Sequence, residues 1–202
     1  MKKSEKVIVS VVIAAAGKGT RMNCDINKQY IDICGRPVLA RTISAFEECK
    51  LIDEIILAVN ENDIVYCKKN IIDTYCFTKV TQIVAGGENR QQSVYNGLCS
   101  VHPYSGIVLI HDGARPFIKE DIIEESIIAA SNFGAACVAV PVKDTIKSVG
   151  TQGFAERTMP RENLWIIQTP QVFRCSLIKE AHKHAINDGF TGTDDCVLIE
   201  RL

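Results

Sequence analysis

Short apolar runs alternate with longer amphipathic segments, and this alternation constrains the fold more than any other feature of the sequence. Runs of strand length, rich in Val and Ile, lie at residues 7–14, 54–59, 80–84, 106–110 and 135–140. Between them, apolar side chains recur at helical spacing in residues 37–49, 63–74, 89–101 and 119–131. Strands that alternate with helices pair in parallel, and the helices cover both faces of the sheet. The sequence therefore predicts an α/β fold with a largely parallel sheet.

The pattern changes at residues 141–166, which are polar and charged and include Gly150 and Gly153. We expect two extended limbs around a turn, either a surface loop or an arm that packs on a partner. Helical spacing returns at residues 176–187, and a capping sequence predicts a last helix at residues 193–202. The chain has 202 residues without repeats or a linker. That length suits one compact domain over residues 1–202, with or without a small appendage.

Charge and cysteine usage exclude several classes of function. The formal net charge of −1 leaves no basic field for wrapping nucleic acid. No run approaches the roughly 18–20 apolar residues of a membrane span, and the apolar N-terminal run reads as a buried strand instead of a signal peptide. The nine cysteines are scattered and form no Cys-x-x-Cys pair, which argues against a zinc site. We expect free thiols in a reducing cytoplasm.

The first apolar run leads into a glycine loop, Ala14-Ala15-Ala16-Gly17-Lys18-Gly19-Thr20-Arg21-Met22. Open α/β sheets bind ligands at the carboxyl ends of their strands, where small residues let backbone N–H groups approach phosphate oxygens. A dinucleotide fingerprint needs a third glycine where Met22 stands, and a P-loop needs lysine where Thr20 stands. What remains is a loop with the cations Lys18 and Arg21, and with Lys28 just beyond. A plain turn with solvated basic residues is the alternative.

Two further loops follow predicted strands. In His111-Asp112-Gly113-Ala114-Arg115, Asp112 is a candidate Mg²⁺ ligand and Arg115 a planar partner for phosphate, although these residues also favour a plain turn. We interpret His111 as structural. The other loop contains Gly86-Gly87 and Ser93, which could contact a base or ribose or could simply form a turn into a helix.

His182 and His184 are two residues apart on a predicted helix. Their side chains point in different directions, so they make a poor metal pair. We expect both at the surface.

Taken together, these blocks resemble the 2-C-methyl-D-erythritol 4-phosphate cytidylyltransferases from about residue 7 to residue 200. The resemblance extends to Lys28-Gln29-Tyr30, Arg90-Gln91-Gln92-Ser93, Lys143-Asp144-Thr145, Arg161-Glu162-Asn163-Leu164-Trp165, Gln168-Thr169-Pro170-Gln171 and Thr193-Asp194-Asp195. It implies a Rossmann-like nucleotidyltransferase fold with helices on both faces of the sheet and a protruding β-arm. It also implies transfer of CMP from CTP to 2-C-methyl-D-erythritol 4-phosphate, with release of pyrophosphate, in the non-mevalonate isoprenoid pathway.

The resemblance also implies roles for individual residues. Arg21 and Lys28 match the catalytic pair that stabilises the transition state, and Asp112 matches the acid associated with Mg²⁺. The positions that match CTP contacts are Ala15, Ala16, Gly17, Lys18, Gly19, Gly87 and Ser93. The positions near the acceptor are Arg115, Asp144, Thr145 and Thr169. Arg161 matches an arginine that an arm carries into the neighbouring subunit's site, which makes residues 141–166 the dimerisation arm of a homodimer.

Two alternatives remain at this stage. Ribitol-5-phosphate cytidylyltransferase has the same fold and chemistry, but tends to begin its loop with Ala-Gly-Gly where this sequence has Ala15-Ala16-Gly17. The resembling family also continues into a C-terminal segment with an Asn-x-Lys-x-Thr stretch, which is missing from this sequence because it ends at Leu202. The second alternative is therefore a nucleotide-binding protein without activity.

Overall fold

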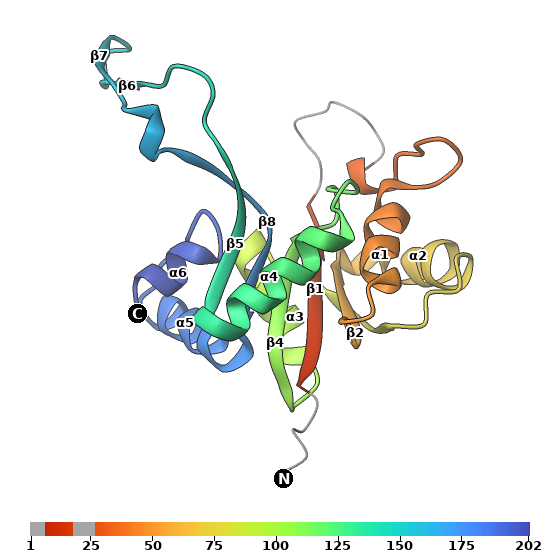
Figure 1. Ribbon diagram of the computed structural model, residues 1–202. Coiled ribbons are helices and arrows are strands. Elements are labelled where there is room, and N and C mark those ends of the chain that lie inside the picture. The colour runs from red at the N-terminus through yellow and green to blue at the C-terminus, as the bar shows by residue number, and fades with distance from the viewer. Residues whose placement is uncertain (1–6, 18–26) are drawn as a thin grey trace.

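A six-stranded sheet forms the centre of the computed structural model, which describes residues 7–17 and 27–202 (Figure 1). Its strands are β1 (Ile8–Ala15), β2 (Glu54–Val59), β3 (Val80–Ala85), β4 (Ser105–Asp112), β5 (Ala135–Pro141) and β8 (Trp165–Arg174), in the order β3-β2-β1-β4-β8-β5. Strands β3, β2, β1 and β4 are parallel, whereas β8 is antiparallel to both β4 and β5. The predicted α/β fold with a largely parallel sheet is confirmed.

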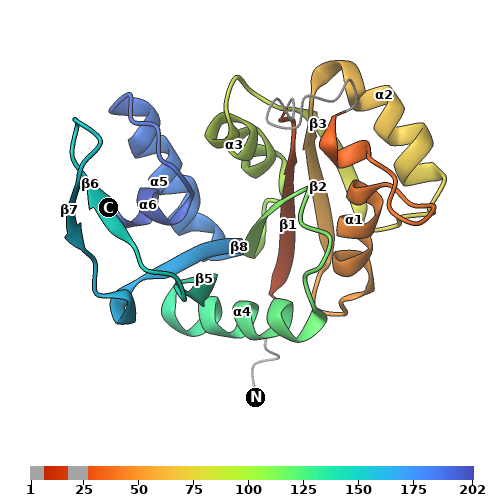
Figure 2. The ribbon, with the colours of Figure 1, turned by 90° about the horizontal axis from the view of Figure 1, so that it is seen from above.

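Helices cover both faces of this sheet (Figure 2). They are α1 (Val38–Glu48), α2 (Ile64–Cys67), α3 (Arg90–Ser100), α4 (Glu120–Phe133), α5 (Cys175–Asn187) and α6 (Cys196–Glu200). The region predicted as helical at residues 63–74 consists of α2 and a π-helical turn, Lys68–Asp73. In the described part of the chain, none of the helices has both the length and the apolar character needed to cross a lipid bilayer.

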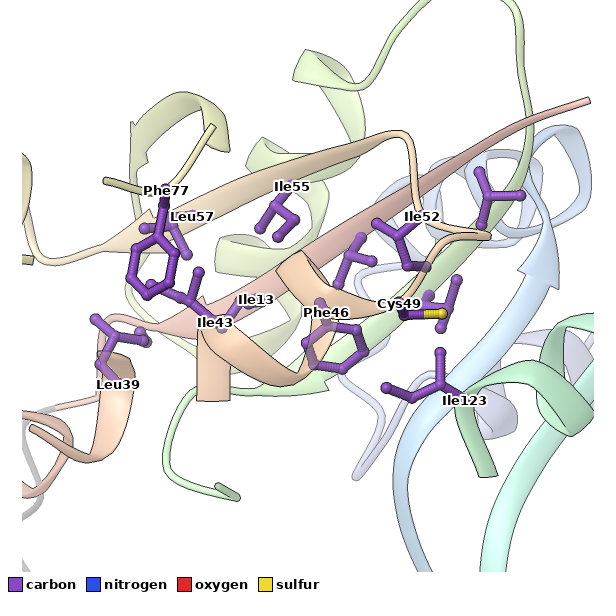
Figure 3. Close-up of a cluster of buried hydrophobic side chains, with 14 of the residues drawn as sticks. Ile13, Leu39, Ile43, Phe46, Cys49, Ile52, Ile55, Leu57, Phe77 and Ile123 are labelled. Atoms are coloured by element: carbon purple, nitrogen blue, oxygen red, sulfur yellow. The ribbon is translucent and has the colours of Figure 1, made fainter. Parts of the chain in front are cut away.

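Strand β1 separates two hydrophobic cores because successive side chains of a strand point to opposite faces. Ile13 packs with Phe46 of α1 and Ile123 of α4 in one core, part of which is drawn in Figure 3. Val12 packs with residues of α3 and α5 in the other core. Both side chains are fully buried. Apart from Ser10 near its amino end, the side chains of β1 are apolar, so ligand chemistry is left to the loop at its carboxyl end.

Helix α3 packs closely on β1 because Gly97 has no side chain. A Cβ added at Gly97 would lie 2.4 Å from Cγ1 of the buried Val12, which is too close for any real contact. The contact places the N-terminal end of α3, with Arg90, beside the carboxyl ends of the strands.

Strand β8 was not predicted from the sequence. Pro170 lies within it and has no N–H to donate to a neighbouring strand, which argues against a central strand. The sheet accommodates Pro170 because the register between β5 and β8 shifts across it: Cys137 lies opposite Gln171, but Ala139 lies opposite Ile167. The apolar residues on either side of Pro170 therefore still pair.

A hairpin protrudes from the sheet between β5 and β8 (Figure 1). It consists of the short antiparallel strands β6 (Lys147–Val149) and β7 (Ala155–Thr158). This is the predicted protruding arm. Two large apolar side chains near it are exposed, Phe154 at 73% and Trp165 at 57%, so in a single chain the arm buries little of its own apolar surface.

Candidate active site

The parallel strands end at one edge of the sheet, where several loops that carry predicted site residues begin. Ala14 of β1 lies beside Asp112 of β4, and Ala15 lies beside Val59 of β2. Val59 in turn lies beside Ala85 of β3. Neighbouring strands are roughly 5 Å apart, so the described start of the glycine loop, residues 14–17, lies near the Gly86-Gly87 pair and the Asp112 loop although they are far apart in the sequence.

Small residues hold these three loops together. A Cβ added at Gly86 would lie 2.3 Å from the Cβ of Ala16, and one added at Gly113 would lie 2.7 Å from the Cβ of Ala15. A side chain at either glycine would therefore push the loops apart. At Gly17, by contrast, none of the described residues lies within 4 Å of an added Cβ. The described part of the chain thus leaves room at the Gly17 backbone, as a phosphate-binding loop requires.

Lys28 is the exposed residue of a 3₁₀ turn, Lys28–Tyr30, that is tied to the end of β1. The side-chain amide of the buried Gln29 donates a hydrogen bond to the carbonyl oxygen of Ala15 over 2.9 Å. Gln29 was not predicted as a site residue, although it lies within the block Lys28-Gln29-Tyr30. The other predicted residues of this region, Lys18, Gly19 and Arg21, lie outside the described residues.

Ser93 supports the loop that contains Gly86 and Gly87. Its hydroxyl accepts a hydrogen bond from the backbone N–H of Gly87 at 3.0 Å and donates one to the carbonyl oxygen of Asn89 at 2.8 Å. The side chain of Asn89 caps α3 by accepting from the N–H of Gln92. Because Ser93 is only 3% exposed, its clearest role in this structure is to fix the backbone of Gly87.

Asp112 lies between two arginines at the end of β4. Its Oδ1 accepts a hydrogen bond from Arg90 Nε and its Oδ2 accepts one from Arg115 Nε, each at 3.0 Å. Arg115 also contacts the side chain of Gln168, and the hydroxyl of Thr169 accepts from the backbone N–H of Asp112 at 3.3 Å. The structure therefore brings together three of the predicted site residues, Asp112, Arg115 and Thr169.

Three of the predicted acceptor residues lie elsewhere, on or beside the arm. Asp144, Thr145 and Arg161 are exposed. The guanidinium of Arg161 donates to the carbonyl oxygen of Lys143 at 3.0 Å, which links the two limbs of the arm. Within one chain, the described contacts do not join these residues to Asp112.

Two charged residues of the site were missed by the sequence analysis, Arg90 and Asp195. The Nη1 atom of Arg90 lies 2.6 Å from Oδ2 of Asp195, whose side chain is only 1% exposed. Both residues lie in sequence blocks that carry the family resemblance, but they are 105 positions apart. Spacing alone therefore could not pair them.

The prediction that His182 lies at the surface was wrong. Its side chain is completely buried, and its Nε2 lies 3.3 Å from Oδ1 of Asp195. The side chain faces inward on α5 and stacks on Tyr95 of α3, with ring centroids 5.9 Å apart. The neighbouring His184 is exposed, as predicted.

The charges of the site shift the pKa values of its members. Burial alone would raise the pKa of Asp112, but the charges and hydrogen bonds of Arg90 and Arg115 outweigh burial, and the pKa is lowered. Burial alone would lower the pKa of Arg90, but Asp195 and Asp112 raise it. Asp112 and Arg90 are therefore a carboxylate and a guanidinium at neutral pH.

The residues at the end of β4 suit Mg²⁺, which prefers oxygen ligands and is commonly held by one or two carboxylates together with substrate phosphates. Asp112 provides such a carboxylate and is 31% exposed. In the described part of the chain, the group of three side chains that could hold a metal by themselves is Cys49, Glu120 and Glu124, and it does not include Asp112. An ion at Asp112 would therefore depend on ligand phosphates for most of its coordination.

Comparison with known proteins gives a consistent family. The model described as 2-C-methyl-D-erythritol 4-phosphate cytidylyltransferase matches residues 9–202. The protein of that name from Alkaliphilus oremlandii is 52% identical over 193 residues, which cover 96% of this chain and 82% of that protein. The corresponding protein from Caldanaerobacter subterraneus is 50% identical over 194 residues, covering 96% and 86%. The crystal structure of 4-diphosphocytidyl-2C-methyl-D-erythritol synthase from Anaerococcus prevotii has a TM-score of 0.84 at 34% identity, and the match covers 96% of this chain and 82% of that one.

His111 supports the Asp112 loop from inside the protein. Its ring is fully buried and packs edge-on against Phe46, with centroids 4.9 Å apart. Nε2 donates to the carbonyl oxygen of Arg115 at 3.0 Å, which defines the tautomer. Burial lowers the pKa of His111 from 6.5 to about 4, more than its hydrogen bond raises it.

This pKa predicts a specific loss of stability in mild acid. Below pH 6.5 the unfolded chain binds a proton at His111 that the folded chain does not bind until about pH 4. The free energy of unfolding should therefore fall by about 2 kcal/mol between about pH 7.5 and pH 5 because of this residue. Urea unfolding of His111→Gln should show a correspondingly smaller fall. The exposed-histidine control His184→Gln should keep the wild-type slope, and a wild-type slope in His111→Gln would contradict the prediction.

Proposed function

We infer that this chain, which belongs to the 2-C-methyl-D-erythritol 4-phosphate cytidylyltransferase family, transfers CMP from CTP to 2-C-methyl-D-erythritol 4-phosphate and releases pyrophosphate in the non-mevalonate isoprenoid pathway. The observation that carries this inference is the family match over residues 9–202. That range includes all the strands whose carboxyl ends form the site, apart from the first residue of β1.

The reaction replaces one phosphorus–oxygen bond by another. A phosphate oxygen of the acceptor attacks the α-phosphorus of CTP, and the bond from that phosphorus to the bridging oxygen breaks. The electron pair of the broken bond leaves with pyrophosphate. Together the two substrates carry roughly six negative charges near neutral pH. Such a transfer depends mainly on positioning and charge neutralisation, so we assign no protein nucleophile.

We propose that Arg21 and Lys28 are the catalytic cations that stabilise the charge developing around the α-phosphorus. The support for Lys28 is its location: the turn that carries it is tied through Gln29 to Ala15, at the end of β1. Its side chain is exposed and therefore free to meet a ligand. The role of Arg21 is supported by its place in the glycine loop that continues from β1.

We propose that CTP lies along the edge formed by the two glycine loops. The room that the described residues leave beside Gly17 and the close contact between Ala16 and Gly86 suit a triphosphate held by backbone N–H groups. Ser93 would act in part through Gly87, whose N–H it holds. The complete proposed set is Ala15, Ala16, Gly17, Lys18, Gly19, Gly87 and Ser93.

We propose that Asp112 holds Mg²⁺ together with phosphate oxygens of CTP. When bound, the ion would neutralise phosphate charge and help to orient the triphosphate. The chain's own part is to keep the Asp112 carboxylate ionised and oriented, which Arg90 and Arg115 favour.

We propose that the acceptor phosphate binds beside Asp112 with help from a second subunit. Arg115 and Thr169 are in place within one chain, whereas Asp144, Thr145 and Arg161 lie on or beside the arm. The exposed apolar side chains there favour burial against a partner. In this proposal residues 1–202 form one nucleotidyltransferase domain, and residues 141–166 join two copies into a homodimer in the cytoplasm.

The acceptor can be tested directly. With CTP and Mg²⁺, pyrophosphate release should be fast with 2-C-methyl-D-erythritol 4-phosphate and ~10²-fold less efficient with ribitol 5-phosphate, because a site built for one set of hydroxyl groups rejects another. Preference for ribitol 5-phosphate would refute the proposed acceptor. CTP binding in a calorimeter without pyrophosphate from either acceptor would indicate a non-catalytic nucleotide-binding protein.

Removal of either catalytic cation should slow the transfer step. We expect Arg21→Ala and Lys28→Ala each to lower kcat ~10³-fold or more, as removal of other cations at phosphoryl-transfer sites does. Lys50→Ala is a matched control, because Lys50 is exposed and precedes the opposite, amino end of β2. Unchanged kcat in Arg21→Ala or Lys28→Ala would refute the catalytic role of that residue.

Arg161 should matter for the acceptor more than for CTP. We expect Arg161→Ala to raise the KM for the acceptor ~10-fold or more, as expected for loss of a charge-assisted hydrogen bond to phosphate. The affinity for CTP should change much less. Lys183→Ala, at an exposed position of α5 outside the arm, should resemble wild type. Equal losses for both substrates in Arg161→Ala, or a monomeric wild-type protein in sedimentation experiments, would count against the proposed arm.

A further inference from the structure

Four polar side chains, each in contact with the next, connect the buried side of α5 with the carboxyl end of β4. His182 Nε2 lies 3.3 Å from Asp195 Oδ1, and Asp195 Oδ2 lies 2.6 Å from Arg90 Nη1. Arg90 Nε then lies 3.0 Å from Asp112 Oδ1. Exposure rises along these side chains, from 0% and 1% at His182 and Asp195 to 32% and 31% at Arg90 and Asp112. The four side chains thus lead from the buried interior to the partly exposed edge of the sheet.

Asp195 is held firmly by the sheet itself. Its backbone N–H donates to Oε1 of Gln171 at 2.9 Å, and the Nε2 of the same Gln171 donates to Asp194 at 3.0 Å. Gln171 is 1% exposed and lies on β8, opposite Ile110 of β4 and Cys137 of β5. The position of Asp195 is therefore defined by the central strands and not by the surface loop that precedes it.

His182 holds the second oxygen of Asp195. Because a carboxylate only accepts hydrogen bonds, the His182 Nε2 atom must donate. The ring also stacks on Tyr95, which lies on α3 five residues after Arg90. The same histidine therefore contacts both the carboxylate and the helix that carries the arginine.

The charges show what Asp195 contributes. Without it, Arg90 and Arg115 would share the single carboxylate of Asp112. With it, two guanidinium groups are balanced by two carboxylates, and Arg90 is closer to Asp195 than to Asp112. Arg90 can then orient Asp112 without neutralising it completely, which leaves the Asp112 carboxylate able to interact with a ligand.

We propose that Asp195 and His182 are positioning residues for the transfer reaction: they hold Arg90, and through it Asp112, in the arrangement used at the strand ends. This proposal rests on the proposed function. Neither residue touches the reacting atoms. Their effect should therefore be on turnover more than on the binding of CTP without Mg²⁺, because in this proposal Asp112, through which they act, meets the nucleotide only through the ion.

The test compares kcat with CTP affinity in isosteric variants. Asp195→Asn removes the charge and keeps the shape. It should lower kcat ~10-fold to ~100-fold, the range expected for a lost charge-assisted hydrogen bond. The calorimetric Kd for CTP, measured without acceptor and without Mg²⁺, should change less than about threefold. Asp195→Glu should recover part of the loss in kcat. Asp188→Asn is the matched control, because Asp188 pairs with Arg201 at the exposed surface and should behave as wild type.

A second comparison separates positioning from general stability. His182→Gln keeps an N–H donor and His182→Leu does not, although both remove the stacked ring. The leucine variant should therefore have the lower kcat. In an Arg90→Ala background, Asp195→Asn should have little further effect on kcat, because its effect acts through Arg90. Thermal unfolding of every variant gives the temperature at which all are folded, and kcat is compared there.

The outcomes distinguish this proposal from the function on which it rests. If wild type releases no pyrophosphate from CTP and the acceptor, the proposed function fails. If wild type is active and folded Asp195→Asn keeps wild-type kcat, the positioning proposal alone is overturned. It is also overturned if Asp195→Asn and Arg90→Ala lower kcat independently, or if CTP affinity falls as much as kcat. Should Asp195→Asn not fold, equal kcat in His182→Gln and His182→Leu would overturn it.

Discussion

The parallel arrangement of β3, β2, β1 and β4 is the constraint on which the rest of this protein depends. Parallel strands need crossover helices, and these helices cover both faces of the sheet, so Val12 and Ile13 are both fully buried. The faces of these strands are therefore closed to a ligand. Polar chemistry remains possible where the strands stop, and four carboxyl ends stop at the same edge. Small residues such as Gly86 and Gly113 then let the loops from different strands touch one another.

At this edge of the sheet, two carboxylates and two guanidinium groups balance one another's charge. Asp112 is therefore not an isolated acid. Asp112 has a lowered pKa despite its burial because two arginines flank it. Arg90 remains charged despite its own burial because two carboxylates flank it. Such a group supplies fixed charge before any ligand arrives, and fixed charge is what transfer between phosphates requires. The buried Asp195 carboxylate balances part of the Arg90 charge. Arg90 can therefore orient Asp112 without neutralising it completely.

The arm and β8 are consecutive in the sequence, but only β8 belongs to the central sheet. Strand β8 lies between β4 and β5 and carries Thr169 and Gln171, which contact Asp112 and Asp195 through hydrogen bonds. The hairpin that precedes β8 leaves the sheet altogether. Residues that support the site from within one chain and residues on the arm are therefore consecutive along the sequence but separate in space. This separation lets the proposed acceptor contacts of β8 and the proposed partner contacts of the arm come from one stretch of chain.

The sequence alone was sufficient for the order of strands and helices through residue 140 and for the positions of the loops that follow β3 and β4. Apolar periodicity and glycine chemistry are local, and a strand buried on both faces is continuous in the sequence. Strand β8 could not be predicted because Pro170 interrupts its pattern, and only the shifted register with β5 makes the pairing possible. The burial of His182 and its link through Asp195 to Arg90 were also decided by the tertiary structure. They depend on which way α5 faces and on a contact between residues 105 positions apart, and neither is encoded in local spacing.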